Sequence, residues 1–207
     1  MLNPNYYDRI VSANRTKWDR IYSNRDNPGS PSEVLSENLS ILPSKGLALD
    51  LACGLGANSL FLESKGLSVH AWDISIIAIE KLKRKIDSNK LNITAQCLDI
   101  KAEALPTNEY DLIIISNYLD RSLTSAIFNA LRAEGLVCYQ TFTAEKRVKL
   151  GPSNPDYLLR PNEIKSFVKG CQILAFKDQS LSTDVNHPLS GKSYIIGQKP
   201  ATNDKDQ

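Results

Sequence analysis

Short apolar runs alternate with amphipathic stretches through most of this chain. Strands are predicted at 47–51, 67–72, 93–98, 110–116, 136–142, 171–176 and 193–196. Apolar residues at helical spacing predict helices at 57–65, 75–86, 123–131 and 161–168. Strands that alternate with helices form a parallel sheet through right-handed crossovers, whereas the last two strands have no helix between them. We therefore expect an α/β, doubly wound sheet that is mostly parallel, with one antiparallel strand near the C-terminus.

The residues before the first strand predict two helices. The stretch around Trp18 and Tyr22 has apolar residues at helical spacing. A second helix is expected after the break at residues 27–29, and Ser32 is suited to cap it. The apolar stripe of that helix would consist of Leu35, Leu39 and Leu42.

This pattern divides the chain into three parts. Residues 1–44 are expected to form an N-terminal helical extension, and residues 45–198 a single sheet domain. Residues 199–207 are polar and are expected to be a flexible tail.

Charge and cysteine content narrow the range of partners. The 207 residues carry a formal net charge of +2, which offers no electrostatic footprint for nucleic acid. No apolar run approaches membrane-spanning length, and the first residues lack the apolar stretch of a secretory signal. The four cysteines include no C-x-x-C pair, so neither a metal site nor a disulfide framework is expected. We expect a cytoplasmic protein, monomeric or weakly dimeric, that binds neither nucleic acid nor membrane.

A glycine turn between a strand and a helix is the strongest chemical signal. In the segment 47–60 (LALDLACGLGANSL), an apolar strand carries Asp50 and turns through Gly54 and Gly56 into a helix. A dinucleotide site would need a third glycine where this chain has Ser59. A carboxylate before the turn instead favours S-adenosylmethionine, whose amino acid moiety is cationic. A tight turn without a ligand is the structural alternative.

Two further aspartates follow predicted strands. Asp73 ends the second strand, where a carboxylate can accept hydrogen bonds from both ribose hydroxyls of a nucleoside. Asp99 ends the third strand and could accept from an adenine amino group, with Ile100 beside it. Asp73 could instead cap the next helix, and Asp99 could be an ordinary turn residue. Because carboxyl ends of parallel strands meet at one edge, these acids are expected to converge.

As an ordered set, these motifs resemble those of class I S-adenosylmethionine-dependent methyltransferases, which have a Rossmann-like fold. The W-D-x-x-Y pattern at 18–22, LDLACGLGANSLFL and HAWDIS are most similar to the tellurite-resistance (TehB-type) small methyltransferases. Ala52 departs from the commonest motif, which has glycine there.

The resemblance implies S-adenosyl-L-methionine as cofactor and a small molecule as methyl acceptor. The aromatic pair near the N-terminus would form part of a lid, with ordinary core packing as the alternative. The cofactor-binding residues implied are Trp18, Asp50, Ala52, Cys53, Gly54, Gly56, Asn58, Asp73, Ile74, Asp99, Ile100 and Ser116.

No motif in the sequence points to a catalytic residue. Asn117 and Tyr118, which follow the fourth strand, are the candidates by position. They do not form the Asn/Asp-Pro-Pro-aromatic motif of enzymes that methylate planar nitrogens. His70 is expected to be a core residue, and His187 a turn residue. The alternatives are a catalytically silent S-adenosylmethionine-binding module and a nicotinamide-dependent oxidoreductase, which the absent third glycine disfavours.

Overall fold

Within residues 4–201, which the computed structural model describes, seven strands form one sheet in the order β3-β2-β1-β4-β5-β7-β6. Side chains are described from residue 11 onward. Strands β1 to β5 are mutually parallel, and β7 runs antiparallel to both of its neighbours, as predicted. The strands are β1 (Leu47–Leu51), β2 (Ser68–Asp73), β3 (Ile93–Cys97), β4 (Tyr110–Ser116), β5 (Leu131–Phe142), β6 (Gln172–Asp178) and β7 (Lys192–Gln198).

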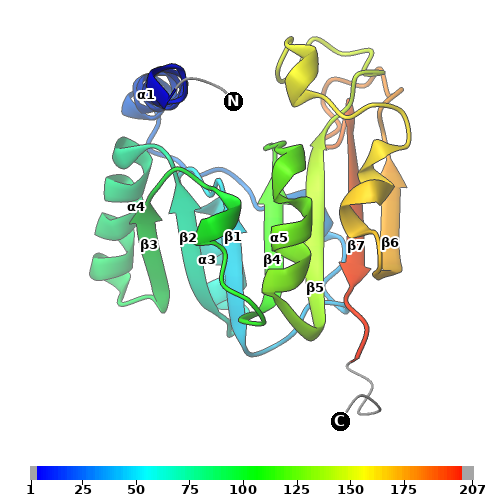
Figure 1. Ribbon diagram of the computed structural model, residues 1–207, viewed down its shortest axis with the longest axis horizontal. Coiled ribbons are helices and arrows are strands. Elements are labelled where there is room, and N and C mark those ends of the chain that lie inside the picture. Colours follow the sequence, from blue (N-terminus) through cyan, green and yellow to red (C-terminus); the bar gives the residue numbers. More distant parts are fainter. Residues whose placement is uncertain (1–3, 202–207) are drawn as a thin grey trace.

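Helices cover both faces of this sheet (Figure 1). The α-helices are α1 (Pro4–Ser23), α2 (Glu33–Ser36), α3 (Ala57–Ser64), α4 (Ile76–Asn89) and α5 (Thr124–Ala130). The 3₁₀ helices are η1 (Ala102–Ala104), η2 (Arg121–Leu123), η3 (Pro155–Tyr157) and η4 (Glu163–Val168). None of the helices described in this part of the chain is both long and apolar enough to traverse a bilayer.

Strand β4 explains why one stretch of the sequence is almost wholly apolar. Leu112 and Ile114 pack in the core layer that also contains residues of α2, α3 and α4. Ile113 and Ile115 pack in the opposite layer, with residues of α5 and η4. A strand covered on both faces has no polar side to present, so its residues do not alternate.

The second predicted helix is much shorter than expected. α2 ends at Ser36, and Leu39, which was expected in its apolar stripe, is 51% exposed. The side-chain Nδ2 of Asn38 donates to the carbonyl of Val34 at 3.0 Å, taking the acceptor that the next helical N–H would use. The prediction of a stripe through Leu35, Leu39 and Leu42 was therefore wrong.

Two other boundaries differ from the prediction. β5 begins at Leu131 instead of residue 136, because its ladder with β4 is interrupted by a register shift at Tyr110/Leu112 and Glu134 takes a φ of +62°. The segment predicted as a helix at 161–168 is a 3₁₀ helix, in which Ile164 and Phe167 are three residues apart and both buried.

The expected tail from residue 199 falls mostly outside the described residues. Lys199 itself is tied to the sheet, since its N–H donates to the carbonyl of Gly135 at 2.9 Å and its Nζ donates to that of Leu131 at 2.6 Å. Residues 202–207 lie outside the part of the chain that the structure describes.

Candidate functional site

The predicted acids gather at one edge of the sheet. β1, β2 and β3 are adjacent and parallel, with Leu51 paired to Trp72 and Asp73 paired to Cys97. The chain order reverses between β1 and β4, which places a topological switch point beside the end of β1. In doubly wound sheets this edge is where ligands bind.

The glycine turn leaves β1 with three residues in the left-handed region. Ala52, Gly54 and Gly56 have φ angles of +58°, +55° and +84°. A Cβ on Gly56 would lie 2.6 Å from a methyl of Leu82, so this glycine allows α4 to pack against the turn. A Cβ on Gly54 would lie 2.6 Å from the hydroxyl of Tyr22, so α1 rests directly on the turn.

Asp50 is fully buried and only half satisfied. Its Oδ2 accepts a 2.6 Å hydrogen bond from the hydroxyl of Ser59, while its Oδ1 has no hydrogen-bond partner among the described residues. Burial raises the pKa of Asp50 to about 7, against the hydrogen bond from Ser59, which lowers it. Ser59 is the residue that breaks the dinucleotide pattern, and in this structure it serves the carboxylate instead.

Asp73 holds the glycine turn and the start of α4 together. One of its oxygens accepts from the N–H of Gly54 and the other from the N–H of Ser75, both at 2.8 Å. Burial raises the pKa of Asp73, against these two backbone hydrogen bonds. The cap of α4 is Ser75, whose Oγ accepts from the N–H of Ala78, so the capping role left open for Asp73 belongs to its neighbour. Each carboxylate oxygen of Asp73 can accept a further hydrogen bond.

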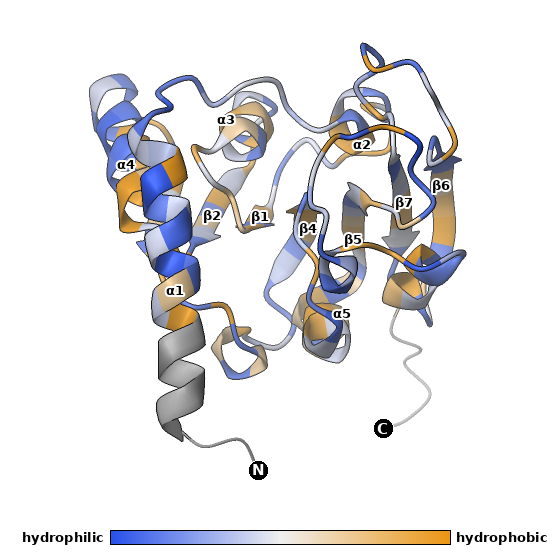
Figure 2. Cartoon of the chain, turned by 90° about the horizontal axis from the view of Figure 1, so that it is seen from above, coloured by the Kyte–Doolittle hydropathy of each residue, from blue (hydrophilic) through white to orange (hydrophobic). Residues whose placement is uncertain are grey.

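Helix α1 lies over this edge. Seen from above, α1 lies beside α4 on the side of the sheet where β2 lies (Figure 2). The rings of Trp18 and Tyr22 stack with centroids 5.7 Å apart, and Asp19 accepts from the hydroxyl of Ser75 at 2.6 Å. Burial and the neighbouring Asp73 raise the pKa of Tyr22 well above its usual range, so its hydroxyl stays protonated.

Asp99 and Ile100 follow β3 but differ in burial. Asp99 is half-buried, with an oxygen 3.8 Å from the ammonium of Lys101. The side chain of Ile100 is buried in the same core layer as Trp72. Asp99 is therefore accessible to a ligand, whereas most of the Ile100 side chain already packs against protein.

The end of β4 carries a polar cluster in which Ser32, expected only as a helix cap, joins the predicted site residues. The hydroxyl of Ser32 donates to that of Ser116 at 2.7 Å, and its N–H donates to the Oδ1 of Asn58 at 2.8 Å. Asn117 is exposed with a φ of +54°, and its Nδ2 donates to the Oγ of Ser116 at 3.1 Å. The carbonyl of Tyr118 accepts from the hydroxyl of Tyr139 at 3.0 Å. Both catalytic candidates therefore lie where the predicted site lies, on a rigidly bonded turn.

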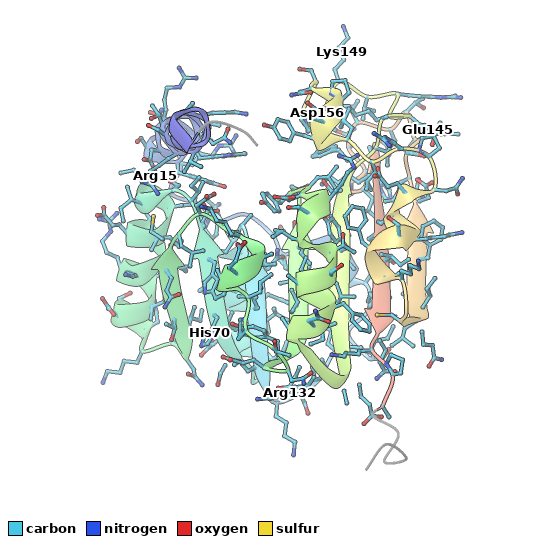
Figure 3. All side chains as sticks on the ribbon, in the orientation of Figure 1. Arg15, His70, Arg132, Glu145, Lys149 and Asp156 are labelled. Atoms are coloured by element: carbon cyan, nitrogen blue, oxygen red, sulfur yellow. The ribbon has the colours of Figure 1, made fainter. Side chains whose placement is uncertain are left out.

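The opposite wall of the site comes from the loop after β5. Figure 3 shows Arg15 on α1 and Asp156 on η3 at the same edge, on opposite sides of it. The ammonium of Lys17 lies 5.4 Å from the ring centroid of Trp18 and 5.9 Å from that of Tyr157, so the two walls approach each other there.

Neither histidine takes part in this arrangement. His70 lies within β2, below the edge that carries the aspartates (Figure 3), and its Nδ1 is 3.0 Å from the hydroxyl of Tyr110. His187 accepts from the N–H of Leu189 at 3.1 Å and sits in a turn. In residues 11–201, whose side chains the structure describes, no three His, Cys, Asp or Glu side chains are grouped so that they could hold a metal ion.

Solved structures share this fold. The crystal structure of TehB from Haemophilus influenzae superimposes with a TM-score of 0.63 at 23% identity, covering 81% of this chain and 61% of that one. A structure described with the conversion of a disulfide bond into a thioacetal group during echinomycin biosynthesis superimposes with a TM-score of 0.68 at 17% identity, covering 92% and 94% of the two chains. At these identities the likeness establishes the Rossmann-like fold.

Sequence comparison identifies the family. A Haemophilus influenzae (strain 10810) protein described as "Probable S-adenosyl-L-methionine-dependent methyltransferase TehB" is 29% identical over 152 residues, which is 70% of this chain and 52% of that protein. The chain thus spans about half the length of the curated relatives it matches. The family model "Tellurite resistance protein TehB" matches residues 16–181. The predicted resemblance is confirmed, and the chain belongs to the TehB family.

Proposed function

We propose that this protein is an S-adenosyl-L-methionine-dependent methyltransferase acting on a small-molecule acceptor. The observation that carries the proposal is the unpartnered Oδ1 of the fully buried Asp50, beside a turn that holds a second buried carboxylate, Asp73. A buried carboxylate without a partner is costly, and a cationic ligand would satisfy it. The amino acid end of S-adenosyl-L-methionine carries an ammonium group of the required charge.

The residues present fit this cofactor. Asp50 would receive the ammonium, and Asp73 would receive the ribose hydroxyls on its remaining lone pairs. Asp99 would face the adenine amino group, and the glycine turn would let the backbone approach closely. The other residues proposed to line the cofactor are Trp18, Ala52, Cys53, Gly54, Gly56, Asn58, Ile74, Ile100 and Ser116.

When bound, the cofactor supplies a methyl group activated by a sulfonium, which is the difficult part of the chemistry. The protein then has to align the acceptor with the methyl group and to exclude water. Tyr22 covers the glycine turn at Gly54, and Trp18 stacks on Tyr22. Ser116 and Asn117 are neutral hydrogen-bonding groups suited to orient an acceptor.

The acceptor is proposed to be a group that is already nucleophilic, such as a thiol or a metalloid oxyanion. Both histidines are bonded elsewhere, and Asn117 is not a base. An acceptor that loses its proton readily needs no base from the protein. Asn117 and Tyr118 are the residues proposed to contact it.

The test is a turnover screen. Purified protein is incubated with S-adenosyl-L-methionine and a panel of thiol, metalloid oxyanion, hydroxyl and amine acceptors, and S-adenosylhomocysteine is measured. We expect turnover with members of the first two groups. Calorimetric binding without turnover on any acceptor would favour a silent binding module, and absence of binding would overturn the assignment.

We extend the proposal to the organisation of the chain, its partners and its location. Residues 1–44 would act as the lid-bearing extension, residues 45–198 as the methyltransferase domain and residues 199–207 as a tail. The formal charge of +2 supports a protein whose partners include neither nucleic acid nor membrane. A cytoplasmic location and a monomeric or weakly dimeric state complete the proposal.

A further inference from the structure

A lysine outside the predicted motifs binds the end of the covering helix. Lys81, on α4, donates from its Nζ to the carbonyls of Tyr22 at 2.8 Å, Ser23 at 3.3 Å and Arg25 at 2.8 Å. The same ammonium lies 2.8 Å from a carboxylate oxygen of Asp26. An ammonium has three protons, which these four oxygens at the end of α1 share.

The contact of Lys81 with the carbonyl of Tyr22 is important because Tyr22 lies against the glycine turn. Tyr22 is the residue whose hydroxyl lies over Gly54, where a Cβ would approach it to 2.6 Å. A hydrogen bond to the carbonyl of Tyr22 fixes the backbone from which that side chain emerges. The helix C-terminus also carries a partial negative charge, which favours a cation.

The rest of α4 is locked to the same turn. Leu82, the next residue after Lys81, packs against Gly56. Ser75, at the start of α4, donates to Asp19 of α1 and is itself bonded to Asp73. α4 and its cap therefore contact the glycine turn and the proposed ribose carboxylate. They also hold α1 at two points, Asp19 and the carbonyl of Tyr22.

We propose that Lys81 is a positioning residue that keeps α1 closed over the cofactor, so that Tyr22 covers the glycine turn. This inference rests on the proposed function. The side chain of Lys81 is only 15% exposed, whereas that of its ionic partner Asp26 is 92% exposed. The backbone carbonyls, and not the ion pair, therefore provide most of the hold.

The experiment compares Lys81→Met with a matched control. Lys85→Met removes the lysine one turn further along α4, whose Nζ donates to the carbonyl of Asp26 at 3.3 Å. We expect Lys81→Met to raise the Kd for S-adenosyl-L-methionine about tenfold, equivalent to the loss of about one charged hydrogen bond. Lys85→Met should stay within about twofold of the wild type, as is usual for an exposed contact.

Readouts other than activity separate positioning from general damage. In cofactor-free Lys81→Met, amide hydrogen exchange should accelerate in residues 15–25 and stay unchanged in β1 and β4. KM for the cofactor should rise while kcat at saturation holds, and Lys81→Arg should recover most of the affinity. If Lys81→Met does not fold, Asp19→Ala is the second variant, because it removes the hydrogen bond between α1 and Ser75. It should also raise the Kd for S-adenosyl-L-methionine.

Two results would overturn the inference. One is a cofactor affinity in Lys81→Met equal to that of Lys85→Met. The other is a loss of affinity accompanied by faster exchange throughout the sheet, which would make Lys81 an ordinary stabilising residue. Failure of the proposed function would look different, because the wild type itself would then not bind S-adenosyl-L-methionine.

Discussion

The two halves of the sheet differ in the sequence separation of the hydrogen bonds that build their shared edge. In the half formed by β1, β2 and β3, the hydrogen bonds that hold the two buried carboxylates are local: Ser59 to Asp50 spans nine residues, and Gly54 to Asp73 spans 19. In the half formed by β4, β5 and β7, the bonds join distant segments. Ser32 and Ser116 are 84 residues apart, and the N–H of Val34 donates to Gln140 across 106 residues.

We expect this difference to separate cofactor binding from the selection of the acceptor. A site built from one strand–turn–helix unit repeats its geometry wherever that unit folds, which suits a cofactor of fixed shape. A site assembled from a loop, a short helix and two strand ends can change with each of them, which suits acceptors of varied shape. We therefore expect substitutions in the first half to alter cofactor affinity and those in the second to alter acceptor use.

The largest effect is expected at Asp73. Asp73→Ala would remove the proposed ribose acceptor and leave the N–H groups of Gly54 and Ser75 without their partner. We expect the Kd for S-adenosyl-L-methionine to rise at least about 100-fold, as measured by calorimetry. Asp99→Ala, at a half-buried position, should cost less. Equal losses for the two variants would contradict the placement of the ribose at Asp73.

The next effect is a pH dependence set by Asp50. Its pKa of about 7 lies above the ordinary value of 3.8, so at neutral pH much of the free protein holds a proton there. A bound ammonium favours the ionised form, so binding must release that proton. We expect affinity for the cofactor to fall by up to about tenfold for each pH unit below about 7.

Asp50→Asn is the control for this titration. It should bind weakly but with little pH dependence between 5 and 8, on the same calorimetric scale. The sign for stability is opposite: because the folded pKa of Asp50 is raised, the cofactor-free wild type should lose stability as pH rises from about 4 to about 7. Asp50→Asn should not show that decline in thermal unfolding, and a wild-type affinity that is flat with pH would refute the role given to Asp50.

In the half formed by β4, β5 and β7, Gln140 tests whether acceptor use can change without a change in cofactor affinity. Its Oε1 accepts from the N–H of Val34 at 2.8 Å, and its Nε2 donates to Glu33. Gln140→Leu would leave the buried N–H of Val34 unpaired, lowering the free energy of unfolding by about 1–3 kcal/mol in urea titrations. We expect the KM for the acceptor to change while the Kd for the cofactor stays within about twofold of the wild type. A large change in cofactor affinity would show that the two halves are not separable.

The smallest effect is expected at Ala52. Its φ of +58° costs an alanine about 1 kcal/mol, which glycine would not incur. The greater freedom of glycine in the unfolded chain offsets about 0.4–1 kcal/mol of that gain. Ala52→Gly should therefore raise the free energy of unfolding by only a few tenths of a kcal/mol by chemical denaturation. A loss above about 1 kcal/mol would mean that packing of the Ala52 methyl outweighs its backbone strain.

The same contrast explains what could be predicted from the sequence. Strand periodicity, the glycine turn and the three aspartates are patterns within short windows, and the mostly parallel arrangement of the sheet follows from crossover rules. The contacts of Ser32, Gln140 and Lys81 depend on which distant segments meet, so no local pattern reveals them. α2 was overestimated for the same reason, since Val34 and Asn38 are fixed by hydrogen bonds that the apolar spacing does not encode.

The direction of β7 has a practical consequence for experiments on this protein. Because β7 runs against β5, it carries the chain away from the edge where Asp50, Asp73 and α1 lie, and Lys199 is anchored at the far edge beside Gly135 (Figure 1). A fluorophore or affinity tag joined to the chain at residue 201 would be attached on the side of that far edge. The same addition ahead of α1 would load the helix that covers the glycine turn. Immobilisation through the C-terminal side is therefore the orientation in which surface-based binding measurements should report the unperturbed molecule.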